Sequence, residues 1–527
     1  MVVFMYSPIE FTLPDKSYED HCWILQDEHN PASHPPLIAS ASPMAALAPK
    51  QDPDQPPTTI NINGFNYARE IPPGDVVTPL AQVSNPESIE DMTKWRKEWL
   101  PEVEKLVEML ESFDPELVAQ GDWEETLKFH DQEYARVFRG IHRTSVGPGR
   151  VSATRFLDKW VEGFGEDRRA DGMALLQGFP NLSLDRASAL WNLGRIIKGD
   201  ESLSGLQDID QILLQIESHH FDIARGVEFK KDFDLMIERF GCTSNNGLQD
   251  LPTWREGSQI PISMINAYSN LDDTKNPVLA SDIQKHQRLV LESELRSKAQ
   301  ENTEFMELVR LMEMAQYLLP NVEDHNLLCD QQCVASSRLR WLRIGSFMKG
   351  NGLVYEDSDV FYYRREELEE ALQGGSVLSK SEIDNRRANQ IEFRSILPPL
   401  YLGQKPKNTE NTLNLPEEGT TVKIIKGIPT SPGSYRGNAK VFQSIDDAKY
   451  LEEGDILVVR ALTPPWTPYL GLVGAVVTNS GGPLSHAAIV AREFGVPAVL
   501  GTVNGTDFIK TGAVISVDGS QGIVVIE

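Results

Sequence analysis

The sequence predicts a protein of more than one domain, in which a mainly α-helical domain is followed by a small α/β domain. Three observations lead to this fold class. The chain has 527 residues, more than a single hydrophobic core usually organises. Over much of residues 86–400 the apolar side chains recur every three or four positions, which is the period of a helix that buries one face. Beyond residue 420 short β-branched runs alternate with glycine-rich turns, a pattern typical of strands.

The predicted helical domain opens with an amphipathic segment, SIEDMTKWRKEWLPEVEKLVEMLESF. Its apolar residues fall on one helical stripe, made of Met92, Trp95, Trp99, Val103, Leu106 and Leu110. Later segments such as DRASALWNLGRIIKG and FKKDFDLMIERFG repeat this spacing. The turn-rich stretch between Gly241 and Leu279 is expected to be a loop that could line a cavity. We therefore expect residues 86–400 to form one helical domain.

Different compositions mark the segments on either side of it. Residues 1–60 are rich in Pro, Ala and Ser, which favours an extended arm, and TTININGFNYARE then alternates with the period of a strand. Residues 1–85 are thus expected to be an arm and strand segment that packs on the helical domain. Residues 401–420 are polar and turn-rich, which predicts a linker and leaves residues 421–527 as the small domain. A small domain on a linker is typical of a part that moves.

Composition and charge exclude several classes of protein. A net charge of −27, with no Lys/Arg-rich stripe, argues against nucleic acid as a partner. No run approaches the ~18 apolar residues of a membrane span, and the N-terminal sequence lacks the features of a signal peptide. Four irregularly spaced cysteines fit a reducing compartment. Together these observations predict a cytoplasmic protein.

The segment VTNSGGPLSHAAIVAREFGVPAVLG carries the chemistry. Gly481 and Gly482 permit a tight turn or the close approach of a ligand to the backbone. Ser485 is placed to cap a helix that begins at about His486, where free N–H groups favour an anion. A neutral imidazole at that point is a plausible nucleophile toward phosphorus, and Arg492 could offset phosphate charge. The alternative is that His486 only caps or packs the start of the helix.

The whole string closely resembles the signature of the swivelling phosphohistidine domain of phosphoenolpyruvate-utilising enzymes. The shared elements are two glycines, Ser-His-Ala, an Ile-Val-Ala-Arg helix and Gly-Val-Pro-Ala-Val, and IKGIPTSPGSYRGNAKVF resembles the start of the same domain. The resemblance implies that His486 carries a phosphoryl group. GPLSH is more similar to the branch that phosphorylates antibiotics and phenols, because the dikinases and synthases usually have Thr-Cys before the histidine.

Related enzymes combine this carrier with an ATP-grasp domain and an acceptor domain, and some end in a (β/α)₈ barrel. Residues 1–400 lack a glycine-rich phosphate loop between strands, and no barrel follows the carrier region. MIERFG followed by LPTWREG is similar to a stretch in the acceptor-binding domain of rifampicin phosphotransferases, and WILQDEHNPASHPP resembles their N-terminal entry segment. The arrangement most resembles the carrier subunit of phenylphosphate and related aryl (cresol-type) phosphate synthases.

That resemblance implies a dikinase-type phosphotransferase subunit with a phosphohistidine intermediate. ATP and Mg²⁺ would be bound mainly by a separate ATP-grasp subunit, and the acceptor would be the hydroxyl of a phenol, giving an aryl phosphate, AMP and phosphate. Two other functions stay open. One is phosphorylation of a bulky, antibiotic-type hydroxyl compound, and the other is a regulatory phosphocarrier that docks on proteins.

Candidate acceptor residues cluster in VEDHNLLCDQQCVASSRLRWLR. Asp324 and His325 could take the proton of a phenol, and Arg338 could bind phosphate oxygens. The equally weighted alternative is that Asp324 and His325 are exposed residues near the start of a helix. Cys329 and Cys333 are expected to be ordinary buried thiols, because two further metal ligands at matching spacing are missing.

The remaining candidates are weaker. Trp254 and Trp341 could wall a substrate pocket, although core packing is the common role of a tryptophan. The same holds for Tyr362 and Tyr363. The pair at 219–220 in IESHHFD is a minor candidate that fits the end of a helix equally well.

Overall fold

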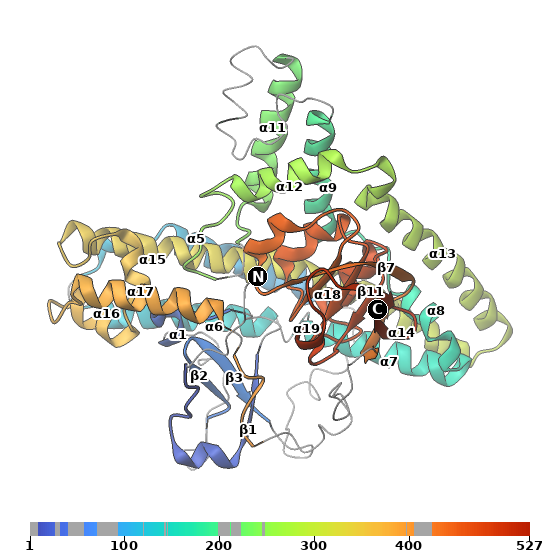
Figure 1. The fold of residues 1–527 in the computed structure, drawn as a ribbon, viewed down its shortest axis with the longest axis horizontal. Helices are drawn as coiled ribbons and strands as arrows, with labels where there is room; N and C mark the ends of the chain where they lie inside the picture. The colour runs from blue at the N-terminus through green and yellow to red at the C-terminus, as the bar shows by residue number, and fades with distance from the viewer. Residues whose placement is uncertain are drawn as a thin grey trace.

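The computed structural model describes residues 9–26, 32–40, 57–70, 93–119, 121–141, 146–198, 223–244, 248–396, 398–404 and 424–527, with positions 144 and 211. Met92, the histidine pair at 219–220 and most of the expected linker lie outside these ranges. A mainly helical body surrounds a smaller α/β unit, as the sequence predicts (Figure 1). We call residues 93–396 the helical body and residues 424–527 the C-terminal unit. No described helix is long and apolar enough to cross a membrane.

A four-stranded antiparallel sheet joins the early residues to the end of the helical body. Its order is β2 (Thr59–Ile62), β3 (Phe65–Arg69), β1 (Cys22–Leu25) and β4 (Tyr401–Gly403). The first residues of the expected linker therefore form an edge strand. Trp23 and Tyr67 are fully buried beneath the sheet, and the Tyr67 hydroxyl donates to the carbonyl of Pro399 at 3.0 Å.

One group of helices lies to the left in Figure 1. It consists of α1 (Pro36–Ser40), α5 (Leu100–Glu111), α6 (Trp123–Ile141), α15 (Gln332–Gly350), α16 (Arg365–Leu372) and α17 (Lys380–Ser395), with the short helices η2 (Trp95–Trp99), η3 (Pro115–Leu117) and η8 (Asp357–Tyr362). The predicted stripe from Trp95 to Leu110 is buried at Trp95, Val103, Leu106 and Leu110. The 3.6-residue period therefore located this core face correctly.

The other helices lie at the top and right of Figure 1. They are α7 (Gly147–Phe164), α8 (Arg169–Ala174), α9 (Leu182–Ile197), α11 (Ile223–Phe240), α12 (Gln259–Asn270), α13 (Pro277–Glu301) and α14 (Phe305–His325). The expected loop between Gly241 and Leu279 thus contains a helix, α12, which buries Ile262 and Ile265 against α9. Polar residues are interspersed among the apolar ones of α12, so the sequence did not show a helical period there.

The helices α14 and α15 continue one another through a π-helical turn, η7 (Asn326–Gln331). Such a turn inserts extra backbone into a helix, shifts the faces of the two halves, and is frequent at functional sites. Pro320 lies inside α14, nearly two turns before the π-helical turn.

The C-terminal unit contains an eight-stranded sheet. The order is β5 (Ile424–Lys426), β12 (Ile523–Ile526), β11 (Val514–Asp518), β7 (Ser434–Phe442), β8 (Ile456–Val459), β9 (Ala475–Thr478), β10 (Ala498–Leu500) and β6 (Ile428–Ser431). The strands β7 to β10 run parallel, and β8, β9 and β10 are buried throughout, as continuous runs such as ILVV and AVVT predict. The short helices are η10 (Ile445–Tyr450), η11 (Pro464–Gly471), α18 (His486–Glu493) and α19 (Gly505–Phe508).

The C-terminal unit is docked against the helical body through α18 and η11. One apolar cluster contains Trp466 and Leu470 of η11 together with Leu190 and Tyr268 of the body. The Tyr268 hydroxyl donates to a backbone carbonyl of η11 at position 468. The unit therefore sits in the middle of the molecule, bordered by helices on several sides (Figure 1).

Candidate functional site

The helix α18 starts at His486, as the sequence predicts. Ser485 is its N-cap: the Ser485 hydroxyl accepts from the Ala488 N–H at 3.3 Å and donates to the Gly482 carbonyl at 2.8 Å. Gly481 has φ +110°, a conformation that L side chains rarely adopt, so glycine is required in this turn. The loop and the cap together fix the direction in which the His486 ring leaves the helix.

The imidazole of His486 is held on both sides. Nδ1 lies 2.9 and 3.0 Å from the two carboxylate oxygens of Glu323, which comes from α14 of the helical body. Nε2 lies 3.1 Å from the hydroxyl of Thr467 in η11. A carboxylate can only accept, so we assign the ring proton to Nδ1, and the Thr467 hydroxyl then donates to Nε2. Asn326 Nδ2 is a more distant neighbour, 3.4 Å from Nδ1.

Glu323 is buried, with 2% of its surface exposed, and is nonetheless held in its ionised form. Burial raises the pKa of its carboxyl, but the charge and hydrogen bond of His486 and the Ser183 hydrogen bond outweigh burial, and the net pKa is lowered. Ser183, on α9, donates its hydroxyl to Glu323 Oε1 at 2.6 Å. The Glu323 carboxylate is therefore held in place by Ser183 as well as by His486.

The predicted acid–base pair lies beside this contact but points elsewhere. Asp324 accepts the N–H of Leu182 at 2.9 Å, and burial raises its pKa to about 6. The ring of His325 is buried, with Nδ1 against the Val322 carbonyl and Nε2 3.6 Å from Asp330. The contact with His486 is made by the preceding residue, Glu323, which the sequence analysis did not single out.

The two arginines predicted to bind phosphate are engaged with other groups. Arg338 makes three hydrogen bonds of 2.9–3.1 Å to the carboxylate of Glu256. Arg492 donates to the carbonyls of Thr430 and Pro483 at 2.9 Å each, and burial lowers its pKa to about 10. Arg492 thus ties the loop that precedes His486 to strand β6.

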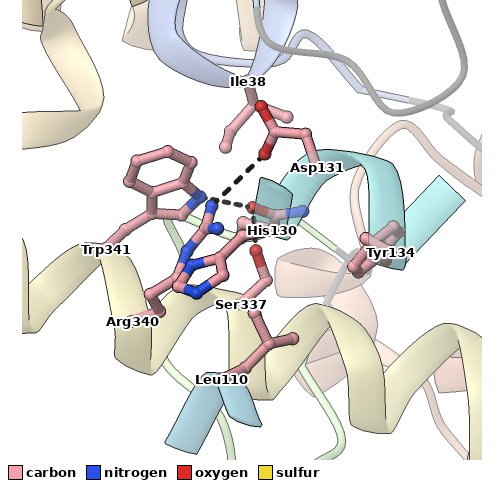
Figure 2. A pocket seen from close by; sticks show the side chains of 9 residues that line it. Ile38, Leu110, His130, Asp131, Tyr134, Ser337, Arg340 and Trp341 are labelled. Atoms are coloured by element: carbon pink, nitrogen blue, oxygen red, sulfur yellow. Dashed lines mark hydrogen bonds and ion pairs between the residues drawn. The ribbon is translucent and has the colours of Figure 1, made fainter. Parts of the chain in front are cut away.

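Trp254 and Trp341 are both buried, at 3% and 2% exposure. Trp341 lines a small cavity with Arg340 and Asp131, whose charges are 3.7 Å apart (Figure 2). That cavity, of about 10 Å³, holds roughly one water molecule. Trp254 packs in the core shared with the C-terminal unit. All four cysteines are buried, as was expected for Cys329 and Cys333.

One buried arginine that the sequence analysis passed over reaches the docked unit. Arg186 is 1% exposed and lies on α9, one turn beyond Ser183. Its Nη1 donates to Thr243 Oγ1 and Gln331 Oε1 at 3.1 Å each, and its Nη2 donates to the Pro464 carbonyl of η11 at 2.8 Å. We call Ser183, Arg186, Glu323 and Asn326 the docking face.

A second carboxylate links the C-terminal unit to the body. Glu493, at the end of α18, accepts the Gly178 N–H at 2.9 Å and the Ser281 hydroxyl at 3.3 Å. Burial raises its pKa to about 7, against the lowering effects of these hydrogen bonds and of Arg492. The site is therefore an interface: His486 comes from one unit, and the carboxylate that holds it comes from the other.

Comparison with known proteins places residues 451–522 in the family described as PEP-utilising enzyme, mobile domain. The chain is 29% identical over 499 residues to chondramide synthase cmdD of Chondromyces crocatus, covering 88% of this chain and 12% of that protein. It is 26% identical over 419 residues to rifampicin phosphotransferase of Streptomyces sviceus, covering 75% of this chain and 45% of that protein.

A further relative is the uncharacterised phosphotransferase YvkC of Bacillus subtilis, 33% identical over 39% of this chain and 25% of that protein. The chain thus spans less than half of the length of each of these relatives. A solution structure of the Enzyme I protein (nEIt) aligns at 20% identity over 45% of this chain and 71% of that chain, with a TM-score of 0.15, which is too low to support a common fold.

Proposed function

We propose that this chain, whose residues 451–522 carry the mobile domain of the PEP-utilising enzymes, is the carrier and acceptor part of a phosphotransferase. His486 accepts a phosphoryl group at a donor site and delivers it to a hydroxyl compound at the docking face. The observation that carries the proposal is the bond between His486 Nδ1 and the buried Glu323 carboxylate across the interface. It leaves Nε2 as the nitrogen able to take the phosphoryl group.

Glu323 has a defined chemical part in this transfer. Its carboxylate keeps the proton on Nδ1, so that an imidazole phosphorylated at Nε2 is positively charged and leaves readily. The acceptor oxygen forms a bond to phosphorus while the P–Nε2 bond breaks, and the electron pair of that bond returns to Nε2. The hydroxyl proton passes to water, and His486 is released with its ring proton on Nδ1.

The donor half of the reaction lies on a separate ATP-grasp subunit in this proposal. That subunit would bind ATP and Mg²⁺, and the products would include AMP and inorganic phosphate. Within the described ranges no three His, Cys, Asp or Glu side chains are grouped as around a metal ion. The loss of the contacts of η11 and α18 would let the C-terminal unit swing to the donor site.

The acceptor is a hydroxyl compound, and two classes are considered. A phenol, giving an aryl phosphate, is the acceptor class that the resemblance of the carrier motif implies. A bulkier, antibiotic-type alcohol is favoured by the similarity to rifampicin phosphotransferase over 75% of this chain. A regulatory phosphocarrier, which would hold its label without a small-molecule acceptor, is the third possibility.

The test is a labelling experiment on the full chain. ATP labelled at the β-phosphoryl group is added with and without a candidate ATP-grasp subunit, and acid-labile label is sought on His486. We expect label only with the partner, none in His486→Ala, and discharge of the label by phenols or by rifampicin. Label on the His486→Ala variant would overturn the carrier assignment. Stable label that neither acceptor discharges would favour the regulatory protein.

A further inference from the structure

Arg186 is a buried charge without a countercharge at contact distance. Among the residues that the structure describes, no carboxylate lies within 4 Å of its guanidinium, and its three hydrogen-bond partners are all neutral. Its Nε has no partner there. A buried ion is costly unless it is paired, and Arg186 stays charged near neutral pH, since burial lowers its pKa only to about 10. The site therefore has an unused capacity for an anion.

The position of Arg186 relates that capacity to His486. Ser183 and Arg186 lie three residues apart on α9 and share a face, and Ser183 holds the Glu323 carboxylate that holds His486. On the other side, Arg186 binds the carbonyl of Pro464, and the Thr467 hydroxyl contacts His486 Nε2. Three residues of 3₁₀-helix span about 6 Å. The guanidinium and the reactive nitrogen thus flank a single turn of η11.

The two arginines that the sequence predicts to bind phosphate already bind other groups. Arg338 is bound to a carboxylate, and Arg492 to two carbonyls of its own unit. A phosphoryl group brings about two negative charges into a closed interface, where His486 has only 12% of its side chain exposed. Arginine suits such a ligand because its planar fork binds two phosphoryl oxygens at once.

We infer that Arg186 is the phosphoryl-binding residue of the docking face, which exchanges its neutral acceptors for the oxygens of a phosphoryl group on His486 Nε2. This inference rests on the proposed function. It makes the docking face selective: Arg186 offsets the new charge, and Glu323 holds the proton on Nδ1. A phosphorylated unit would otherwise be repelled by the Glu323 carboxylate.

The test measures docking with and without the phosphoryl group. The full chain is treated with phosphoramidate, whose P–N bond breaks as ammonia leaves and a P–Nε2 bond forms. Docking is measured at pH 7 by hydrogen exchange of the Gly178 N–H, which is bonded to Glu493 only when the unit is docked. The variant is Arg186→Met, since an apolar residue of similar volume often replaces a buried ion without loss of stability.

Two further variants complete the set. Arg186→Lys keeps the charge but not the fork. Arg195→Met is the matched control, because Arg195 lies on the same helix and its hydrogen bonds go to the carbonyls of Leu271 and Tyr268 and to the Asp273 carboxylate, all in the helical body. We expect unphosphorylated Arg186→Met to lose only the small part of the Gly178 protection that the hydrogen bond of Arg186 to Pro464 supplies. On phosphorylation the protection of Gly178 in Arg186→Met should fall by tenfold or more, and in Arg186→Lys by less. In the unaltered chain and in Arg195→Met it should fall by less than twofold.

Three outcomes would overturn the inference. Equal loss of protection in both forms of Arg186→Met would make Arg186 a structural link to Pro464. Unchanged protection after phosphorylation of that variant would mean that another group holds the phosphoryl oxygens. Loss of protection on phosphorylation of the unaltered chain would mean that the docking face rejects the charged carrier.

Failure of the proposed function itself would look different. Glu493→Arg places a charge against Gly178 and Ser281, prevents docking and exposes His486 to the reagent. If phosphoramidate does not label His486 even in that variant, the carrier assignment fails, and the inference on Arg186 fails with it. Labelling of this variant leaves the carrier assignment intact whatever Arg186→Met shows.

Discussion

The two groups that hold His486 differ in kind and in origin. The carboxylate at Nδ1 belongs to the helical body, whereas the hydroxyl at Nε2 belongs to the C-terminal unit itself. Only the hydroxyl accompanies His486 if the unit moves. The tautomer imposed by Glu323 is therefore a property of the docked state, and the reactivity of the phosphohistidine would depend on where the unit is docked.

Replacing the Glu323 carboxylate by an amide tests this dependence. In Glu323→Gln the side chain keeps its size but no longer favours the protonated Nδ1, so we expect discharge of labelled His486 to an acceptor to slow by roughly 100-fold. Single-turnover transfer of the label measures the rate. Glu307→Gln, an exposed position on the same helix, is the control. An unchanged rate in Glu323→Gln would remove Glu323 from the mechanism.

The residues of this site differ in how far the sequence revealed them. Gly481, Ser485 and His486 stand in one string, and their local geometry follows from turn and capping rules. Glu323 is 163 positions away from His486, so no local pattern links the two. Asp324 and His325 drew attention because they form an acid–base pair in sequence, but the helix directs the neighbouring Glu323 to the carrier.

At the scale of elements, α18 is short and depends on its cap. Eight residues provide few internal hydrogen bonds, so the one free N–H that the Ser485 hydroxyl satisfies, that of Ala488, weighs more here than in a long helix. The turn of η7 is the other decisive element. Helical periodicity predicts α14 and α15 on either side of it, but a π-turn has no strong sequence signal, and it changes which residues of the two halves share a face.

The cap gives a prediction on stability. We expect Ser485→Ala to lower the free energy of unfolding by about 1 kcal/mol, since the Ala488 N–H loses its acceptor. Urea denaturation of the full chain, followed by circular dichroism, measures the change. Ser434→Ala, at an exposed position of the same unit, serves for comparison. A loss no larger than that of the comparison variant would show that the cap does not stabilise α18.

At the scale of the whole molecule, the interface between the two units is both apolar and polar. Trp466 and Leu470 share a core with the body, and Glu493 supplies a buried carboxylate at its edge. The apolar part favours docking in all conditions. The polar part makes docking depend on pH, because Glu493 would lose its bonds to Gly178 and Ser281 and become solvated when the unit leaves.

The sign of this pH dependence follows from the raised pKa. In the docked state burial raises the pKa of Glu493 to about 7, whereas the ordinary value of 4.5 applies when the carboxyl is solvated. Protonation therefore favours docking. The stabilisation of the docked state by this protonation is complete below about pH 4.5, declines as the pH rises, and is lost above about pH 7. Between these limits the docking equilibrium constant changes by at most about tenfold per pH unit.

Hydrogen exchange of Gly178 between pH 5 and 8, corrected for the intrinsic rate, measures this effect. We expect protection to increase as the pH falls through that range, and Glu493→Gln to remove the dependence because an amide does not titrate there. Glu453→Gln, an exposed position in the same unit, should behave as the unaltered chain does. A flat profile in the unaltered chain would contradict the raised pKa.

The sequence by itself determined the helical and α/β composition of the two parts, the start of α18 at His486 and the family of residues 451–522. These features depend on period, capping and a continuous motif, which act over a few residues. Only the tertiary structure decided that Glu323 and Arg186 meet the docked unit and that Arg338 and Arg492 are engaged elsewhere. Those contacts join distant segments, and the partner of a buried charge is set by packing, not by its neighbours in the chain.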